Sequence, residues 1–384
     1  MNLDFAKSAD RVLGSLIGGG LGLADRVLDA LRPPSPVGPI ERILVIKFWG
    51  LGNWALLRPI VRALRARYPG ARLTIATLAG NAPLVRDLAD DILFVRTDSA
   101  LRATADLSRA VRFLRSAPHQ LSLDFEQFSR SGALLGRLGG VPQRLGFRSG
   151  GAGRDGLYTV TIPFHRDRHA SRSFLDLAES AGVPAGAYAP GGLSAAPEAV
   201  ASLRERFTDL DDVVVLHPGS GDNFPGRRWS PAGFQAVGRS ALRHGCRVVV
   251  TGGPGEVELA RAVADGIGAG ATSLAGRLSV AELVALLAGA RALVANDTGP
   301  VHIASQLGVP VLAIYGPNTP VRYGPLSPGS RAFYRSLPCS PCLTNASYRS
   351  SRCRIHTCMD SIPTGAVTGA LDVLLAGEVA EEPR

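Results

Sequence analysis

Residues 296–302, with the sequence Asn-Asp-Thr-Gly-Pro-Val-His, place a carboxylate, a hydroxyl and an imidazole between two apolar runs. Those runs, 292–295 and 309–315, have the composition of buried strands, and a helix is predicted over 298–308. The start of a helix offers unpaired N–H groups and a positive dipole end, and Asp297 can accept hydrogen bonds from hydroxyls. The combination favours an anionic ligand that carries sugar hydroxyls. The alternative is an ordinary helix cap followed by a helix histidine.

Two earlier strands end in loops of similar chemistry. The sequence His-Pro-Gly-Ser-Gly at 217–221 follows an apolar run at 213–216, and Thr-Gly-Gly-Pro-Gly-Glu at 251–256 follows another at 247–250. The carboxyl ends of parallel strands meet at one rim of a sheet, where ligands of α/β proteins bind. Three such loops in series therefore predict a nucleotide site.

The elements that would position these loops alternate along the whole chain. Strands are predicted at 43–47, 73–77, 92–95 and 121–125, with an edge strand at 158–162, and again at 213–216, 247–250, 292–295 and 309–315. Helical runs separate them, which indicates parallel sheets with right-handed crossovers. A Gly, Ala and Pro-rich stretch at 182–197 has the composition of a linker. We therefore expect an α/β protein with a segment at 1–40, one domain at 41–185 and a second at 200–375.

The 384-residue chain is long enough for two cores, and its net charge is +10. A basic balance suits nucleic acid, an anionic membrane or a phosphorylated substrate, but no nucleic-acid-binding motif is visible. Residues 4–31 mix apolar residues with Asp and Arg, and their uncharged run is too short to span a bilayer. We interpret them as an interfacial amphipathic anchor, with a packed helix or a frayed tail as alternatives.

Four of the five cysteines lie close together in the sequence, namely Cys339, Cys342, Cys353 and Cys358. Paired spacing of this kind is compatible with a structural zinc, with two disulfides or with free thiols. We assign them no catalytic role.

Together these motifs resemble glycosyltransferase family 9, the family of bacterial lipopolysaccharide heptosyltransferases. The resemblance covers residues 42–375 and rests on the glycine turn at 43–53, the two loops above, Arg-Arg-Trp-Ser at 227–230 and the 296–302 motif. It implies the GT-B architecture, in which two Rossmann-like domains have parallel sheets facing across a cleft. It also implies metal-independent, inverting transfer from a nucleotide-sugar, typically ADP-heptose.

The resemblance implies that nine residues bind the donor: Gly219, Ser220, Arg227, Glu256, Leu278, Asp297, Thr298, Gly299 and His302. The resemblance implies that Asp297, Thr298 and Gly299 hold the pyrophosphate and sugar region, with His302 one turn on, and that Gly219 and Ser220 approach the phosphates. Arg227 stands where the family usually has a lysine, and a guanidinium can bind phosphate bidentately. Glu256 is expected to accept from the ribose hydroxyls and Leu278 to pack on the base.

One position departs from the family pattern. The family's glycine turn ends in an aspartate that is taken as the general base, and Asn53 stands there in this chain. An amide is not a useful base near neutral pH. We predict that the base has moved to Glu126 or to Asp124, at the same rim. A more nucleophilic acceptor and a loss of turnover are the alternatives. Lys47, at the end of the first strand, is predicted to face the cleft and steady a phosphate or sugar.

The sequence thus predicts an enzyme that moves a sugar, heptose in the leading case, from a nucleotide-sugar to a lipid-linked saccharide such as the lipopolysaccharide core. We expect no required cofactor and no nucleic-acid partner, and a cytoplasmic location on the anionic inner face of the inner membrane. One alternative is a catalytically weak or non-catalytic nucleotide-sugar-binding protein, which Asn53 motivates. Another is a different GT-B enzyme, such as an epimerase of nucleotide-sugars, which would need no acceptor.

Overall fold

The computed structural model describes residues 39–127, 129–148, 153–208, 210–221, 225–343 and 353–377. The chain divides into two compact units, Met1–Ala189 and Pro190–Arg384, which we call the N-terminal and the C-terminal unit. The predicted interfacial segment falls almost wholly within residues 1–38, outside the described ranges. Within those ranges, no helix is long and apolar enough to cross a bilayer.

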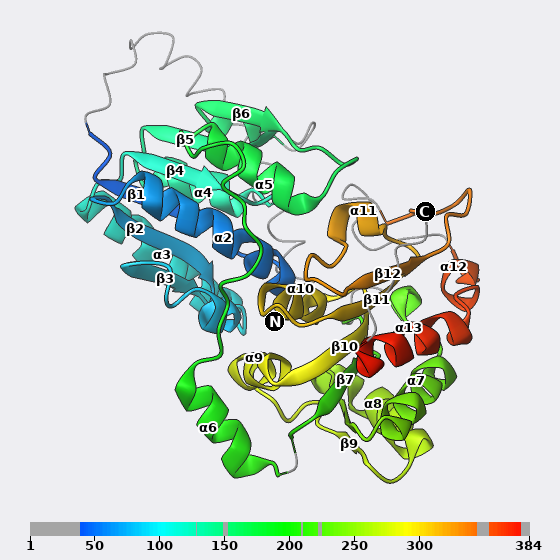
Figure 1. Cartoon of the computed structure of the whole chain (residues 1–384). Coiled ribbons are helices and arrows are strands. Elements are labelled where there is room, and N and C mark those ends of the chain that lie inside the picture. Colours follow the sequence, from blue (N-terminus) through cyan, green and yellow to red (C-terminus); the bar gives the residue numbers. More distant parts are fainter. Residues whose placement is uncertain are drawn as a thin grey trace. The chain divides into compact units, whose positions relative to one another are not determined.

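The N-terminal unit contains a six-stranded sheet in which every strand pairing is parallel (Figure 1). Its strands are β1 (Arg42–Ile46), β2 (Arg72–Leu78), β3 (Asp91–Val95), β4 (Leu121–Asp124), β5 (Gln143–Arg148) and β6 (Val160–Pro163). Its helices are α2 (Leu51–Arg67), α3 (Ala100–Ser116), α4 (Ser131–Leu138) and α5 (Ala170–Glu179), with short 3₁₀ turns η1 (Ala79–Leu84) and η2 (Asp155–Leu157). The strand order is β3-β2-β1-β4-β5-β6, which is that of a dinucleotide-binding sheet.

The sequence missed one strand of this sheet. β5 reads Gln-Arg-Leu-Gly-Phe-Arg, so it lacks the apolar run that marks β1 and β4. It is a strand because it lies between β4 and β6 and completes the pairing of both. The last strand, β6, begins two residues later and ends one residue later than predicted.

The C-terminal unit repeats this topology with the order β12-β11-β10-β7-β8-β9. The strands are β7 (Val213–His217), β8 (Arg247–Val250), β9 (Ala271–Ser273), β10 (Ala290–Asn296), β11 (Val311–Tyr315) and β12 (Arg331–Tyr334). The helices are α6 (Pro197–Arg206), α7 (Pro231–Arg243), α8 (Val257–Ile267), α9 (Val280–Ala288), α10 (Gly299–Gln306), α11 (Pro320–Tyr323), α12 (Thr357–Asp360) and α13 (Thr364–Ala376), with turns η3 (Pro225–Arg227) and η4 (Pro254–Glu256). The short edge strands β9 and β12 were not predicted from the sequence.

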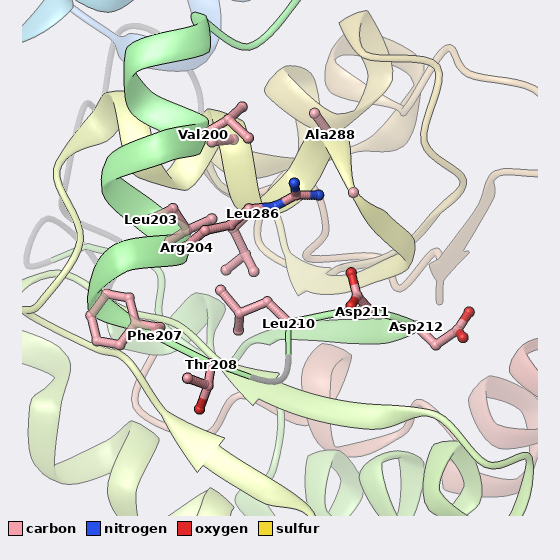
Figure 2. A pocket seen from close by; sticks show the side chains of 12 residues that line it. Val200, Leu203, Arg204, Phe207, Thr208, Leu210, Asp211, Asp212, Leu286 and Ala288 are labelled. Carbon is pink, nitrogen blue, oxygen red and sulfur yellow. The ribbon is translucent and has the colours of Figure 1, made fainter.

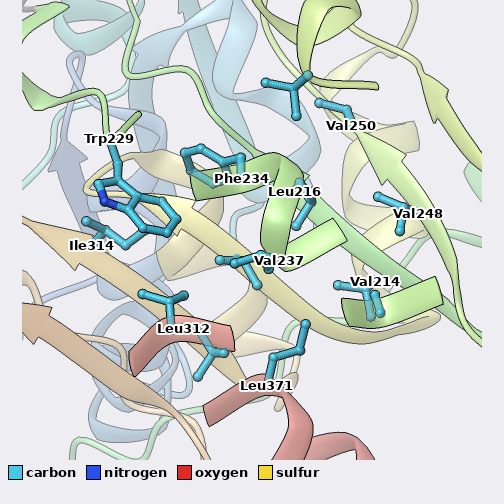
Figure 3. Packing of buried hydrophobic residues seen from close by; sticks show 14 of the residues in the cluster. Val214, Leu216, Trp229, Phe234, Val237, Val248, Val250, Leu312, Ile314 and Leu371 are labelled. Atoms are coloured by element: carbon cyan, nitrogen blue, oxygen red, sulfur yellow. The ribbon is translucent and has the colours of Figure 1, made fainter. Parts of the chain in front are cut away.

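One face of this second sheet packs on α7, α8 and α13 through a continuous apolar core (Figure 3). Trp229 is buried in that core with its ring edge-on to Phe234, at 5.4 Å between ring centroids. Its indole N–H donates to the carbonyl of Ile362. Trp229 is therefore a packing residue that fixes the loop before α7. Ser279 and Glu282 form a capping box at the start of α9.

A hollow of about 720 Å³ lies at the opposite end of the same sheet from its carboxyl-end loops (Figure 2). It is lined by Leu203 and Phe207 from α6 and the stretch following it, by Leu286 from α9, and by Asp211 and Asp212 just before β7. The loop containing Asp211 thus lies away from the predicted donor loops.

A buried polar cluster underlies the carboxyl end of β4 in the N-terminal unit. Asp124 is 1% exposed, and its carboxylate accepts from the Tyr158 hydroxyl at 2.6 Å and from the Glu126 N–H at 2.9 Å. Burial, reinforced by the nearby Glu126 carboxylate, raises the pKa of Asp124 from 3.8 to about 6, against the opposing effects of Arg154 and Tyr158. Arg154 is fully buried and donates to the carbonyls of Ser129, Glu126 and Phe147.

We expect Asp124 to make the free energy of unfolding depend on pH. Because the folded pKa lies above that of the unfolded chain, the contribution is complete below about pH 4 and is lost as the pH rises through about 6, by on the order of 3 kcal/mol. Asp124→Asn, which resembles the protonated form, should lack this loss. Urea unfolding of both proteins between about pH 4 and 7 measures the difference. The exposed Asp167→Asn serves as control, and parallel curves for Asp124→Asn and the wild type would contradict the assignment.

Candidate functional site

The predicted donor loops lie where the strand order of the C-terminal sheet reverses. β7 and β10 are neighbours, but the chain leaves them toward opposite sides, to β8 and to β11. The loop 217–221 follows β7 and Asp297 follows β10, so both stand at this reversal, where open α/β sheets bind ligands.

Asn296 joins these two loops from beneath. It is fully buried, and its side-chain amide donates to the carbonyl of Pro218 at 2.7 Å and more weakly to that of Gly219. Its amide oxygen accepts from the Trp229 N–H at 3.0 Å. Because all these bonds are buried, Asn296 fixes the relative position of the loops after β7 and β10.

Asp297 is the carboxylate at the centre of the site. Its Oδ2 accepts from Asn318 Nδ2 at 2.9 Å and from Arg227 Nη1 at 3.5 Å. Within the described residues no donor bonds its Oδ1. Its carboxylate also lies close enough to Tyr315 to add to the effect of burial, which raises the pKa of that phenol. One oxygen of Asp297 is thus held by the protein and the other is left for a ligand.

Arg227 connects the same two loops from above. It donates to the carbonyl of Ser220 at 2.6 Å and to the carbonyl of Asp297 at 3.0 Å. Its Nε is buried and has no hydrogen-bond partner among the described residues. An arginine whose N–H groups are partly unused beside a carboxylate is suited to a phosphate oxygen.

Glu256 is committed to the loop after β7 rather than left open. Its carboxylate accepts from the N–H groups of Ser220, Gly221 and Gly253 at 2.8–2.9 Å. Burial raises the pKa of Glu256, but these amides and the charge of His217 outweigh it, so the pKa lies below its usual value. The approach is so close that a Cβ at Gly219 would lie 2.2 Å from the carboxyl carbon, which requires glycine there. The predicted ribose contact of Glu256 would add to this role.

The start of α10 completes the site. Thr298 is its N-cap residue in extended conformation, and its hydroxyl makes no capping hydrogen bond, while Gly299 opens the helix. His302 is 6% exposed one turn later, with its ring 6.0 Å from that of Tyr323. Leu278 is half-buried in the loop before α9. The structure thus brings Ser220, Arg227 and Asp297 together, and places the N-terminus of α10 directly after them.

The predicted catalytic residues of the N-terminal unit form a second group at the reversal between β1 and β4. Lys47 and Glu126 are both buried and pair at 3.2 Å between Nζ and Oε2. The other oxygen of Glu126 accepts from the N–H groups of Phe48 and Trp49 at 2.6 and 2.9 Å. The sequence predicted that Lys47 faces a cleft, and the structure pairs it with Glu126. Glu126 in turn holds the backbone of the turn after β1.

Asn53 lies at the far end of that turn, half-buried in the first turn of α2. Gly50 precedes it with a φ of 94°, and a Cβ there would lie 2.6 Å from the Asn53 amide nitrogen. Glycine is thus required at position 50 both by its backbone conformation and by the space that Asn53 occupies. Asp124, the other predicted base, is enclosed by Tyr158 and Glu126 as described above.

Sequence reasoning missed several residues that shape these sites. Asn318 follows β11 as Asp297 follows β10, so the rule of polar residues at strand ends would have found it. Arg154 and Tyr158 lie in a Gly-rich stretch, and no local signal marks them. Their role exists only because the fold brings them under β4.

The cysteines do not form a recognisable metal centre in the described residues. Cys339 is exposed, Cys358 is buried, and none of the five cysteines is in a disulfide. Burial and the neighbouring thiols of Cys342 and Cys353 raise the pKa of Cys358. Within the described ranges, no group of three or more His, Cys, Asp or Glu is arranged to hold a metal ion, so zinc remains a prediction of the sequence.

The sequence is similar to several characterised proteins. It is 24% identical over 306 residues to lipopolysaccharide heptosyltransferase 2 of Salmonella typhimurium, which covers 76% of this chain and 87% of that protein. It is 34% identical over 155 residues to lipopolysaccharide heptosyltransferase 1 of Pseudomonas aeruginosa, a match that spans 38% of this chain and only 42% of that protein.

Two solved structures share the fold across nearly the whole chain. Escherichia coli ADP-heptose lipopolysaccharide heptosyltransferase II superposes with a TM-score of 0.70 at 22% identity, over 88% of this chain and 99% of that one. A family 9 glycosyl transferase from Veillonella parvula gives a TM-score of 0.73 at 20% identity, over 90% of this chain and 100% of that one. The two parallel sheets and these neighbours define a GT-B fold.

The model of glycosyltransferase family 9 (heptosyltransferase) matches residues 109–350, well over half of the chain. This match takes in the end of the N-terminal unit, with Glu126, and all of the predicted donor-binding residues from Gly219 to His302. The chain therefore belongs to glycosyltransferase family 9 and is a glycosyltransferase.

Proposed function

We propose that this glycosyltransferase moves a heptose from ADP-heptose to a saccharide of the lipopolysaccharide core, by inverting transfer without a metal ion. The relatives that support this are lipopolysaccharide heptosyltransferases, and one solved neighbour is an ADP-heptose lipopolysaccharide heptosyltransferase. The acceptor oxygen attacks the anomeric carbon while the bond to the diphosphate breaks. The bonding electrons leave with ADP, and the proton of the acceptor hydroxyl goes to a base.

The observation that carries the proposal is the divided role of Asp297. Asn318 and Arg227 hold one carboxylate oxygen, while no described donor bonds the other. A fixed carboxylate with a free oxygen at a strand end is suited to sugar hydroxyls, because it needs no rearrangement to accept them. Its position beside the start of α10 supports a sugar site next to the proposed diphosphate site.

The departing diphosphate has to be stabilised by the protein's own groups. Arg227 supplies a fixed positive charge, and α10 supplies N–H groups and the positive end of its dipole. The amides of Ser220 and Gly221 are bonded to Glu256, which leaves the Thr298 hydroxyl as a further donor. These groups support charge stabilisation without a metal ion.

Removal of the acceptor proton is the step for which the described residues offer the weakest candidate group. The contacts of Glu126 support a positioning role, because its two oxygens already accept from Lys47 and from two backbone N–H groups. Asp124 is bonded to Tyr158 and has almost no exposed surface. Glu126 would act as the base only if acceptor binding released one of these bonds.

The divided role of Asp297 also favours a second candidate function, a nucleotide-sugar-binding protein with weak turnover. It has the same donor site, but Asn53 orients an acceptor hydroxyl without accepting its proton. The two candidates differ in turnover and not in donor affinity.

We further propose a peripheral location at the inner face of the bacterial inner membrane, where a lipid-linked acceptor is available. The net charge of +10 supports it, because anionic lipid headgroups attract basic proteins.

Calorimetric titration with ADP, UDP, GDP, CDP and their sugar conjugates tests the donor site. We expect selective binding of ADP-linked ligands. We expect Asp297→Asn to weaken ADP-heptose binding by roughly 1.5–3 kcal/mol, or about 10- to 150-fold, because a charged hydrogen-bond acceptor is lost. Asp265→Asn, at an exposed position of α8, is the matched control. Failure of every nucleotide to bind would refute both candidate functions.

Asn53→Asp separates the two candidates. If the wild-type chain is a weak enzyme that lacks its base, the aspartate should raise kcat by about 10²-fold or more with little change in donor affinity. Asn53→Ala controls for loss of the amide contact. A wild-type turnover typical of an efficient transferase, unchanged or lowered in Asn53→Asp, would show that another group removes the proton.

Deletion of residues 1–38 tests the interfacial segment. We expect the truncated protein to bind vesicles more weakly and to keep its ADP affinity, because the donor site lies in the C-terminal unit. Vesicle flotation and calorimetry measure the two effects. Unchanged flotation would show that residues 1–38 do not contribute to membrane binding. Loss of the folded state would show that this segment packs on the domain.

A further inference from the structure

The positive charge of the chain is concentrated in one unit. Residues 39–189 contain 21 Lys and Arg against 12 Asp and Glu, whereas residues 190–384 contain 17 against 16. Residues 1–38 contribute four of each sign. The N-terminal unit thus accounts for nearly all of the net charge of +10, although nothing in the donor site requires this.

Part of this charge gathers on α3, an amphipathic helix on the outside of the N-terminal sheet (Figure 1). Its inner side packs on the sheet through Ala110, Leu114 and the partly buried Leu107. Its outer side carries Leu101, Ala105, Ser108, Arg112 and Arg115, which succeed one another at intervals of three or four residues and all have exposed side chains. Such spacing places them in one stripe along the helix. We call this stripe the outer face of α3.

The arginines of the outer face have little to neutralise them. No carboxylate pairs with Arg112 or Arg115 among the described residues, and Arg115 donates only to the carbonyl of Leu138. Arg102 and Arg109 flank the stripe and are paired with Asp98 and Asp106, of which Asp106 is shared with Arg96. The face therefore carries a net positive charge.

An exposed leucine stands at the start of this basic face. Leu101 is 82% exposed, the largest exposure of the big apolar side chains among the described residues, and Leu138 beside Arg115 is 37% exposed. Water is a poor environment for these side chains, whereas the headgroup boundary of a bilayer accepts apolar groups next to arginine. A nucleic acid would use the charge but not the leucines.

We propose that the outer face of α3 docks on an anionic lipid bilayer, with Arg112 and Arg115 against lipid phosphates and Leu101 inserted at the headgroup boundary. This inference rests on the proposed peripheral location, and it assigns that location to a surface of the folded domain. Guanidinium groups bind phosphate bidentately, and attraction by a charged surface acts within a Debye length, so the docking is sensitive to salt.

The test uses the full chain and vesicles of phosphatidylcholine, with and without phosphatidylglycerol. We expect binding only when phosphatidylglycerol is present, weakening with added salt. Arg112→Gln with Arg115→Gln should weaken binding roughly 10- to 30-fold, and Leu101→Ser about fivefold. Arg112→Lys with Arg115→Lys keeps the charge and should retain most of the binding.

Arg239→Gln with Arg243→Gln is the matched control. It removes the same charge from two exposed positions near the end of α7, in the C-terminal unit. If the control and the α3 variant lost vesicle binding equally, net charge alone would explain the effect, and the proposal would be overturned. Equal binding to vesicles with and without phosphatidylglycerol would also overturn the proposal. So would a DNA duplex that displaces the vesicles and binds more weakly to Arg112→Gln with Arg115→Gln.

Two further measurements keep this inference separate from the proposed function. ADP affinity and transfer to a detergent-dispersed acceptor should be the same in the α3 variants as in the wild type, because the donor site lies in the other unit. Transfer that fails in every protein, with vesicle binding intact, would refute the transferase proposal alone. A chain lacking residues 1–38 should keep a residual binding that Arg112→Gln with Arg115→Gln removes. Loss of all binding on truncation would instead assign membrane attachment to residues 1–38.

Discussion

The order of the strands is the constraint on which the rest of the structure depends. In both sheets the first strand lies beside the fourth, so the chain leaves this central pair toward opposite edges. The loops after the two strands therefore diverge and leave room at their carboxyl ends. Asp297 and the loop 217–221 occupy this position in one sheet, and Glu126 and the turn after β1 occupy it in the other. Every residue for which we propose a direct role in transfer lies at one of these two reversals or in the first turn of the helix that follows.

Buried polar groups keep those loops in place. Asn296 lies beneath the donor loops and Glu256 fixes the backbone of 219–221, while Arg227 ties the two loops together. In the N-terminal unit Glu126 has the same relation to the turn after β1, with Lys47 as its counter-charge. Asn296, Glu256, Glu126 and Lys47 are almost fully enclosed, whereas the Arg227 side chain is 20% exposed. Each unmade bond of an enclosed group would be costly, so the loops are held in one arrangement before a ligand arrives. A donor site that is preorganised in this way loses little entropy on binding.

The two units differ in what they present to a substrate. The C-terminal unit has a free carboxylate oxygen, an arginine and a helix start, which together suit the proposed sugar diphosphate. The N-terminal unit, which we propose binds the acceptor, has an amide at position 53 and two carboxylates that are already bonded, so neither carboxylate is free to remove a proton. It also has an excess of positive charge that donor chemistry does not need. These features are consistent with a unit that handles an anionic, membrane-linked partner.

The sequence by itself determined the alternation of strands and helices, the position of the glycine-rich loops at the strand ends and the family, because apolar runs and glycine-rich strand ends are local patterns. β1, β4, β7, β10 and the helix start at Gly299 were all predictable for that reason. It could not predict β5, whose strand conformation comes from its two neighbours, or the roles of Arg154, Tyr158 and Asn318, which are set by contacts between distant segments. Lys47 and Glu126 were recognised as functional candidates, but only the tertiary structure decided that they pair with each other. A side chain's partner depends on which elements the fold brings within a few ångströms, and spacing along the chain carries no record of that distance.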